Sequence, residues 1–360
     1  MTDDGREPGF PGGDEKMKTG KLPESALKRS VLKQVHTGNH RIKPSVSGMI
    51  LENTKGAAIG SDCAFFAASD GQVLAWCAQE AAVAGKADAG IPAALVQKCV
   101  NNLAAAGACP ASAQIGILLP EKYEEPKLKA LMDQLSAACT AHGMEIAGGD
   151  TNVTSYVTAP IVTITAIGVT DREGMRDLGM AKAGQDLVLS KWIGLEGTAM
   201  LAKAFEEKLC SRYPAYLVKE AAGFDRFLSV EEEAKIAIMN GVAAMHDLSQ
   251  GGVFGALWEL AEGAGLGLMA DLKKIPIRQE TVEVCEVCGV NPYEMRSGGS
   301  LLMTAKDGKA LVKALEAADI PATVIGKLTE GPDRILQNEE EIRFLDRPKG
   351  VDLIAEALNA

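Results

Sequence analysis

Residues 144–151 read Met-Glu-Ile-Ala-Gly-Gly-Asp-Thr. The first four residues predict a strand, and a strongly β segment follows over 159–169. An aspartate that only forms a turn would need one glycine beside it. Two small neighbours allow backbone N–H groups to approach a phosphate closely. Asp150, which follows the glycines, is therefore the strongest single candidate for a ligand-binding carboxylate.

Helical and extended patterns alternate on both sides of this stretch. Helices are expected in an alanine-rich zone that runs to residue 107 and is divided at Gly90 and Pro92, and over 127–142, 199–208, 231–240 and 253–264. Strands are expected over 114–119, 186–192 and 242–246. This order predicts an α/β (α+β) protein of two domains.

The length of 360 residues also suggests two domains. Residues 1–16 are polar and rich in glycine and proline, which predicts a disordered tail and opposes a secretory signal. We expect an N-terminal domain over 17–172, a C-terminal domain over 173–345 and a tail over 346–360. The boundary lies in the polar, irregular stretch 171–184.

The composition excludes several classes of function. Hydrophobic residues make up 47% and charged residues 24%, as in a soluble globular protein. A net charge of −11 and only 4% aromatic residues oppose binding to nucleic acid or to an anionic membrane surface. No stretch approaches the roughly 20 apolar residues of a membrane span. Eight cysteines without a secretory signal predict core thiols, Cys285 and Cys288 included, in a cytoplasmic protein.

Four aspartates stand near glycine or serine where a predicted strand meets a loop: Asp62, Asp70, Asp150 and Asp247. Mg²⁺ takes one or two protein carboxylates and completes its shell with phosphate oxygens. Asp247 also precedes a helix that starts near Gly251 and Gly252, where unpaired N–H groups favour anions. Turn formation alone would also place aspartate beside glycine, and Asp247 could be a simple N-cap.

Other polar residues allow more than one interpretation. On the helix over 92–106, Asn102 falls at the edge of the apolar stripe, whereas Asn101 points away from it and is expected to be solvated. His246 could act as a base, although a locally hydrogen-bonded histidine is the preferred interpretation. The turn over 194–198 could cradle an anion before a helix, but it is not a P-loop.

Taken in order, these stretches resemble the AIR synthase superfamily of ATP-dependent enzymes. Residues 60–64 are similar to its G-D-D-A-A segment, and 100–110 to V-N-D-L-A-M-M-G-A-x-P. Residues 147–151 contain G-G-D-T, and 246–253 are similar to R-D-x-T-R-G-G-L. Residues 194–198 and 285–302 most resemble the branch of the hydrogenase maturation factor HypE. The resemblance covers about residues 20–335.

The resemblance implies a two-domain AIR-synthase-like architecture and a homodimer formed by the N-terminal halves. It also implies that ATP with Mg²⁺ activates an oxygen of an amide- or carbamoyl-like group, on a small molecule or on a carbamoyl-bearing protein. The implied metal ligands are Asp62, Asp70 and Asp150, and the implied catalytic residues are Asp247 and Asn102. The implied cofactor-binding residues are Asp62, Asp70, Gly148, Gly149, Asp150, Thr151, Gly251 and Gly252.

The chain departs from the family pattern at several positions. Ser61 and Asn102 replace aspartates, and Glu196 stands where the HypE branch carries histidine. HypE ends in a cysteine that carries the thiocarbamate, whereas the last cysteine here is Cys288, so an external substrate is expected. Two alternatives remain open: a catalytically degenerate ATP-binding regulator, and a small-molecule kinase of the thiamine-phosphate type.

Overall fold

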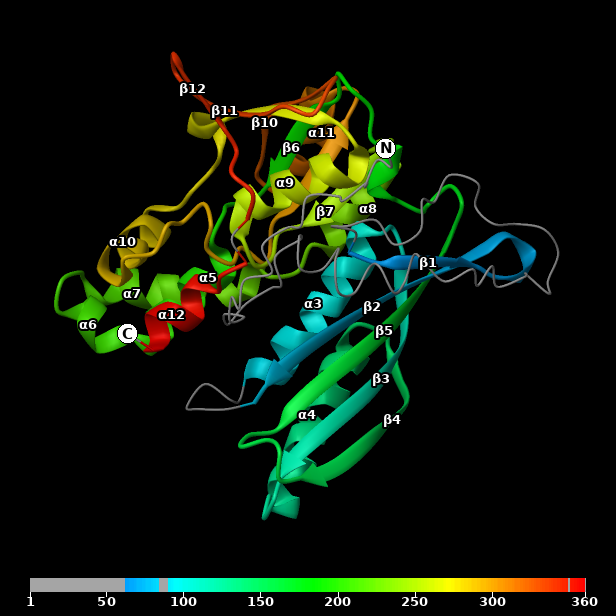
Figure 1. The fold of residues 1–360 in the computed structure, drawn as a ribbon, viewed down its shortest axis with the longest axis vertical. Coiled ribbons are helices and arrows are strands. Elements are labelled where there is room, and N and C mark those ends of the chain that lie inside the picture. Colours follow the sequence, from blue (N-terminus) through cyan, green and yellow to red (C-terminus); the bar gives the residue numbers. More distant parts are fainter. Residues whose placement is uncertain (1–61, 84–89, 349, 360) are drawn as a thin grey trace, which may run out of the picture.

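The computed structural model describes residues 62–83, 90–348 and 350–359. The predicted tail over 1–16 and Ser61 lie outside these residues. The described chain forms two sheets, one in each half (Figure 1). This arrangement confirms the predicted α/β (α+β) class with two domains.

The N-terminal half contains a five-stranded sheet with the order β1-β2-β5-β3-β4. Its strands are β1 (Ala64–Ala67), β2 (Gln72–Ala82), β3 (Cys109–Pro120), β4 (Glu145–Thr154) and β5 (Ile161–Asp171). Only the β3–β4 pair is parallel. β1 and β4 are thus the two edges of this sheet.

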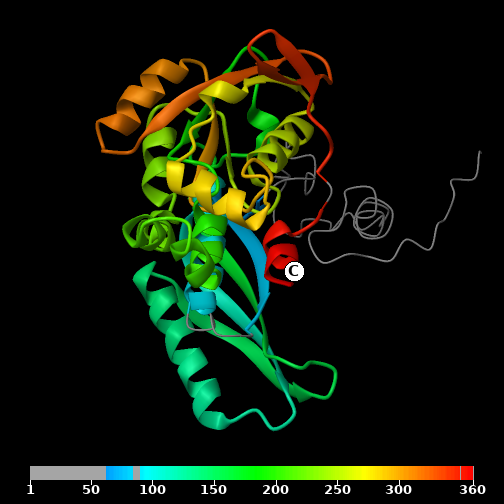
Figure 2. The same ribbon diagram turned by 90° about the vertical axis from the view of Figure 1, so that its left-hand side faces the viewer.

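Helices α3 (Ile91–Ala105) and α4 (Glu125–Ala141) pack on one face of this sheet. Apolar residues of α3 and α4 share a core with alternate residues of the strands, such as Ile115 and Ile164. In Figure 2, α4 lies along one side of the sheet, and no described helix covers the opposite side of its lower half. Phe66, Trp76 and Leu118 on that opposite face are 53%, 38% and 41% exposed.

The C-terminal half contains a seven-stranded sheet with the order β12-β11-β8-β10-β6-β9-β7. Its strands are β6 (Asp186–Ser190), β7 (Ala244–Asp247), β8 (Gly267–Asp271), β9 (Leu301–Ala305), β10 (Ala322–Thr329), β11 (Arg334–Asn338) and β12 (Glu341–Phe344). Residues of α9 (Gly252–Ala264) pack on one face of this sheet. Residues of α8 (Glu231–Met239) and α11 (Gly308–Glu316) pack on the other.

A helical group lies beside this sheet, at the left of Figure 1. It comprises α5 (Leu195–Ala204), α6 (Glu206–Cys210), α7 (Ala215–Ala222), α10 (Gln279–Cys288) and α12 (Leu353–Asn359). Cys285 is buried in its core and Cys288 packs against it, as predicted. Ile354 of α12 is buried in the same core, so the end of the chain packs onto the C-terminal half. No helix of the described ranges is both long and apolar enough to span a membrane.

Two local predictions were wrong. Residues 77–82 continue strand β2 and do not begin the predicted helical zone, because buried Val73, Ala75 and Cys77 alternate with more exposed residues at period two. The glycines at 148 and 149 lie inside β4 rather than in a loop after it. An alanine-rich composition suggested a helix at the first site, and a pair of glycines suggested a turn at the second.

Helix α3 lies between the two halves and contacts β7 and α8 as well as the first sheet. Asn101 is therefore buried, and the prediction that it is solvated was wrong. Its Nδ2 donates to the Leu228 carbonyl at 2.8 Å, and its Oδ1 accepts from the Val230 N–H at 3.2 Å. A helical wheel identifies one apolar stripe, but it does not show that a second domain covers the opposite side.

Candidate functional site

Three side chains meet where the two halves of the chain join. Asp62 precedes β1, and His246 and Asp247 are the last two residues of β7. His246 Nδ1 lies 2.7 Å from Asp62 Oδ2, and the Asp247 backbone N–H donates to the same oxygen at 3.3 Å. One potential ligand atom from each of the three residues lies within 4.8 Å of the others. The fold thus brings together two of the four predicted aspartates, which are 185 residues apart.

His246 lies between two carboxylates. It is 2% exposed, and its Nε2 lies 3.1 Å from Glu259 Oε2 on α9. Burial alone would lower the pKa of His246, but the charges and hydrogen bonds of Asp62 and Glu259 outweigh burial and raise this pKa to about 10. The ring is therefore cationic at neutral pH. Because both ring nitrogens are engaged, His246 holds Asp62 rather than offering a vacant base.

Asp247 is buried beside the same carboxylate. Burial and the negative charge of Asp62 raise the pKa of Asp247 well above its ordinary value. With its amide nitrogen turned toward Asp247, Asn102 donates to Asp247 Oδ1 at 3.0 Å and to the Lys98 carbonyl at 3.1 Å. In that orientation its oxygen accepts from Gln79 Nε2 at 3.1 Å. Asn102 therefore fixes the Asp247 side chain from the N-terminal half.

Helix α9 begins five residues after Asp247, and its first turn depends on glycine. Gly251 and Gly252 have φ angles of +94° and +62°, which favour glycine. A Cβ at position 252 would lie 2.4 Å from the Tyr293 carbonyl oxygen. These glycines therefore let the chain enter the helix directly beside the acidic cluster.

Asp62 and Asp247 are suitable ligands for a magnesium ion. Mg²⁺ in nucleotide sites binds one or two protein carboxylates together with phosphate oxygens. Two carboxylates that face one another, one from each half, meet this requirement. His246 now neutralises Asp62, so a bound cation would compete with the imidazolium for that carboxylate.

The other predicted site residues lie elsewhere in this chain. Asp70 is in the turn between β1 and β2, at the far end of β1 from Asp62. Asp150 and Thr151 are exposed on β4, at the opposite edge of the sheet from β1. Asp150 Oδ2 accepts from Asn152 at 2.7 Å. The fold therefore brings neither Asp70 nor Asp150 to the Asp62–Asp247 pair.

The glycines before Asp150 serve strand packing. Gly148 has open space where a side chain would lie, whereas a Cβ at Gly149 would come within 1.8 Å of the Ile115 carbonyl oxygen of β3. The β3–β4 register shifts between Ala113 and Gln114 at this level. Close approach of two strands therefore accounts for Gly149 without a ligand.

Known proteins share both halves of this chain. The family model for the N-terminal domain of AIR synthase related proteins matches residues 60–170, and that for their C-terminal domain matches residues 182–337. The chain belongs to the AIR synthase related proteins. The carbamoyl dehydratase HypE of Cupriavidus necator is 26% identical over 255 residues, or 67% of this chain and 68% of that protein. HypE of Azotobacter vinelandii is 25% identical over 258 residues, which are 68% of this chain and 71% of that protein.

Solved structures of this family share the fold. A HypE–HypF complex matches 90% of this chain and 100% of the other with a TM-score of 0.66 at 18% identity. A structure of HypE in complex with ATP matches 88% of this chain and 98% of the other, with a TM-score of 0.65 at 18% identity. These likenesses confirm the two-domain AIR-synthase-like architecture.

Glu196 distinguishes this AIR synthase related protein from the pattern of the HypE branch. Its buried carboxylate lies 3.2 Å from Lys98 Nζ of α3 and 3.5 Å from Arg296 Nη1. Burial opposes ionisation, but Lys98 and Arg296 outweigh it and lower the pKa of Glu196. Arg296 also binds Asp352 at 2.6 Å, just before α12. This charged network joins both halves and the C-terminal helix.

The turn around Glu196 is not an anion cradle. The Gly194 N–H donates to Ser297 Oγ at 2.8 Å, and the Gly197 N–H donates to the Arg296 carbonyl at 3.0 Å. The Glu196 carboxylate is buried in the same turn. Because the Gly194 and Gly197 donors already have partners and the turn carries a buried carboxylate, the structure opposes an anion site there.

Sequence reasoning missed two residues of the acidic site. Glu259 binds His246 from the middle of α9, and the Lys98 backbone carbonyl accepts from the Asn102 amide one helical turn earlier on α3. The signal for Glu259 was present, because it is an acid within the apolar run Val253–Ala261. Lys98 gave no signal, because a backbone carbonyl is present at every position.

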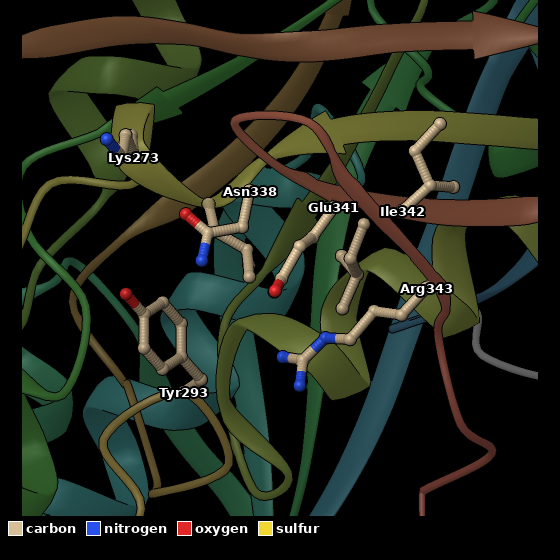
Figure 3. A pocket seen from close by; sticks show the side chains of 8 residues that line it. Lys273, Tyr293, Asn338, Glu341, Ile342 and Arg343 are labelled. Carbon is tan, nitrogen blue, oxygen red and sulfur yellow. The ribbon is translucent and has the colours of Figure 1, made fainter.

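A hollow of about 540 Å³ lies in the C-terminal half, under the β11–β12 hairpin. Side chains of Tyr293, Asn338, Glu341 and Arg343 point into it (Figure 3). The Tyr293 ring stacks on Phe254 of α9 at a centroid distance of 5.2 Å. None of the predicted site residues lines this hollow, so it is separate from the acidic site.

Proposed function

We propose that this protein is an ATP-dependent enzyme that activates an oxygen of an amide- or carbamoyl-like substrate by phosphorylation. The observation that carries the proposal is the Asp62–Asp247 pair beside the start of α9, in which Asp247 is buried and Asn102 reaches it from the other half. The proposal is supported by relatives named carbamoyl dehydratase and by the fold shared with an ATP complex of HypE.

The described residues divide the work between charge and position. Asp62 and Asp247 would hold Mg²⁺, which neutralises charge on the ATP phosphates when it is bound. Gly251 and Gly252 let the N-terminus of α9 approach those phosphates, and Asn102 keeps Asp247 oriented. His246, fixed by Glu259, keeps Asp62 in place.

The reaction then follows the general logic of phosphoryl transfer. The substrate oxygen attacks the γ-phosphorus, the bond to the β–γ bridging oxygen breaks, and ADP leaves. The phosphorylated oxygen becomes a good leaving group and departs as inorganic phosphate in a dehydration or cyclisation. A carbamoyl group on a partner protein or a small-molecule amide would each supply such an oxygen.

We further propose that two copies associate through the bare face of the N-terminal sheet. Phe66, Trp76 and Leu118 expose apolar surface there. Asp150 is level with Gly116 in the β3–β4 register and therefore shares the face of Leu118. Dimerisation would cover this apolar surface and would place Asp150 at the interface, where it could reach a nucleotide held by the second copy.

Two alternatives have specific support. An ATP-binding regulator is favoured by Asn102, where the family carries an acid, and by the imidazolium that already neutralises Asp62. A small-molecule kinase is favoured by the fold shared with thiamine monophosphate kinase from Aquifex aeolicus, at 19% identity and a TM-score of 0.61. The three functions differ in what happens to the phosphate.

An isotope experiment separates them. A cysteine peptide carbamoylated on sulfur with an ¹⁸O-labelled carbonyl is incubated with the protein, ATP and Mg²⁺, and the phosphate is examined by mass spectrometry. The proposed function predicts ADP, a dehydrated peptide and ¹⁸O in inorganic phosphate. A stable phosphorylated product would favour the kinase. ATP binding without ADP formation, across this peptide and simple primary amides, would favour the regulator.

A further inference from the structure

Three buried thiols lie side by side behind the acidic site. Cys63 follows Asp62 directly, Cys77 lies on β2, and Cys99 lies on α3. Cys63 and Cys77 are each 5% exposed, and Cys99 is fully buried. The proposed reaction uses none of them.

Continuing the strand register by one position sets Cys63 opposite Cys77. β1 and β2 are antiparallel and pair Phe65 with Ala75 and Ala64 with Trp76, where the strand pairing ends. Residues directly opposite in such a pair have Cα atoms about 4.5–5.5 Å apart. Disulfides need Cα separations of about 4.4–6.8 Å. Cys63 and Cys77 in this register would therefore have the spacing that a disulfide requires.

Both side chains point to the same side of the hairpin. The Cys63 thiol donates to the Asn102 carbonyl at 3.3 Å, and the Cys77 thiol donates to the Cys99 carbonyl at 3.5 Å. These two acceptors are neighbouring turns of α3. The two sulfur atoms also interact with each other, and this contact lowers the pKa of the Cys77 thiol. The two thiols thus share the face of the hairpin that packs on α3, and their sulfur atoms are neighbours there.

We propose that Cys63 and Cys77 are a site of reversible disulfide formation. A peroxide oxidises one thiol to a sulfenic acid and is reduced to water, and the second sulfur then attacks that sulfenic sulfur and releases a second water. In total, two thiols lose two protons and two electrons, and one hydrogen peroxide becomes two waters. A dithiol reductant reverses the reaction by thiol–disulfide exchange.

The bond would act on the acidic site through Asp62. Forming it removes the Cys63 hydrogen from the contact with the Asn102 carbonyl and ties the residue after Asp62 to β2. Asp62 would then shift relative to Asp247, which it now meets across the junction of the two halves. This effect on ATP rests on the proposed function, whereas the disulfide itself does not.

The experiment uses the full chain with Cys109→Ser and Cys210→Ser, because these two exposed cysteines would react first. The protein is treated with hydrogen peroxide under native conditions, alkylated, digested and mapped by mass spectrometry. We expect a peptide pair linked through Cys63 and Cys77, an intact mass lower by two hydrogens, and full reversal by dithiothreitol. We expect the Cys77→Ala variant to show no loss of two hydrogens from the intact mass. Cys139→Ala, which removes another buried thiol, should still show that mass loss.

The outcomes are distinct. A link between Cys77 and Cys99, or oxygen adducts on Cys63 without a link, would overturn the proposal. Titration of the oxidised protein with ATP and Mg²⁺ provides a separate readout, which we expect to show at least tenfold weaker binding than the reduced protein. If the disulfide forms but the reduced protein also fails to bind ATP, the proposed function fails and the disulfide assignment stands.

Discussion

His246 should make the stability of this protein depend on pH in a defined direction. The ring is buried between Asp62 and Glu259, which raise its pKa to about 10 in the folded chain. In the unfolded chain its pKa is about 6.5. A group whose pKa is raised by folding stabilises the fold fully below the unfolded value. That contribution is then lost as the pH rises toward the folded value.

The magnitude follows from the size of the shift. One pKa unit corresponds to about 1.4 kcal/mol, so the whole contribution of His246 is at most roughly 5 kcal/mol. Over pH 7–9 the wild type should lose about 3 kcal/mol more of its free energy of unfolding than His246→Asn loses. The difference between the two proteins cancels the titration of shared groups that do not contact His246.

The assay is urea unfolding, followed by circular dichroism between pH 6 and 9.5, with EDTA present to remove divalent cations. Glu259→Gln is the companion variant, because it removes one of the two carboxylates that raise the pKa of His246. It should give a smaller pH dependence than the wild type. Equal pH dependence for the wild type and His246→Asn would refute the assignment of a buried imidazolium to this site.

Three further predictions concern packing and assembly. Asn101→Ala should lower the free energy of unfolding by about 2–3 kcal/mol in a denaturant titration, because two buried backbone groups lose their partners. Gly252→Ala should cost clearly more than Gly143→Ala, for which about 1 kcal/mol is expected. Both glycines have a positive φ angle, but only at position 252 would the added Cβ collide with a backbone oxygen. Equal losses in the free energy of unfolding for the two variants would contradict this reasoning. Leu118→Lys should produce monomers in sedimentation experiments, whereas Val153→Lys, on the other face and 64% exposed, should leave a dimer.

Local patterns in the sequence identified most elements correctly. Apolar periodicity predicts the helices α4, α8 and α9 and the strand β3. Gly143, with a φ angle of +68°, lies at the C′ position just after α4, as its sequence context predicts. The end of β2, residues 77–82, was misassigned because small residues such as Cys77 and Ala78 satisfy both helical and strand patterns. Periodicity identifies an apolar face, but small side chains carry little information about which period applies.

The site was only partly predictable. Motifs singled out Asp62 and Asp247, yet their contact depends on how the two halves join, which no local pattern encodes. The same junction explains why Asn101 is buried. Glu259 approaches His246 within the C-terminal half, where α9 packs against β7. Asp150 was the strongest candidate by sequence, but its strand lies at the opposite edge of the sheet from β1. A contact between copies would therefore be needed to bring it to the nucleotide.

The central claim is that Asp62 and Asp247 together hold the metal–nucleotide complex. Calorimetric titration of ATP, with and without Mg²⁺, tests it most directly on the wild type, Asp62→Asn and Asp247→Asn, with Asp133→Asn on the exposed side of α4 as the control. The account predicts Mg²⁺-dependent binding that the control retains and that each site variant weakens at least tenfold. Binding that is unchanged in both site variants, or absent from the wild type at millimolar ATP, would contradict it.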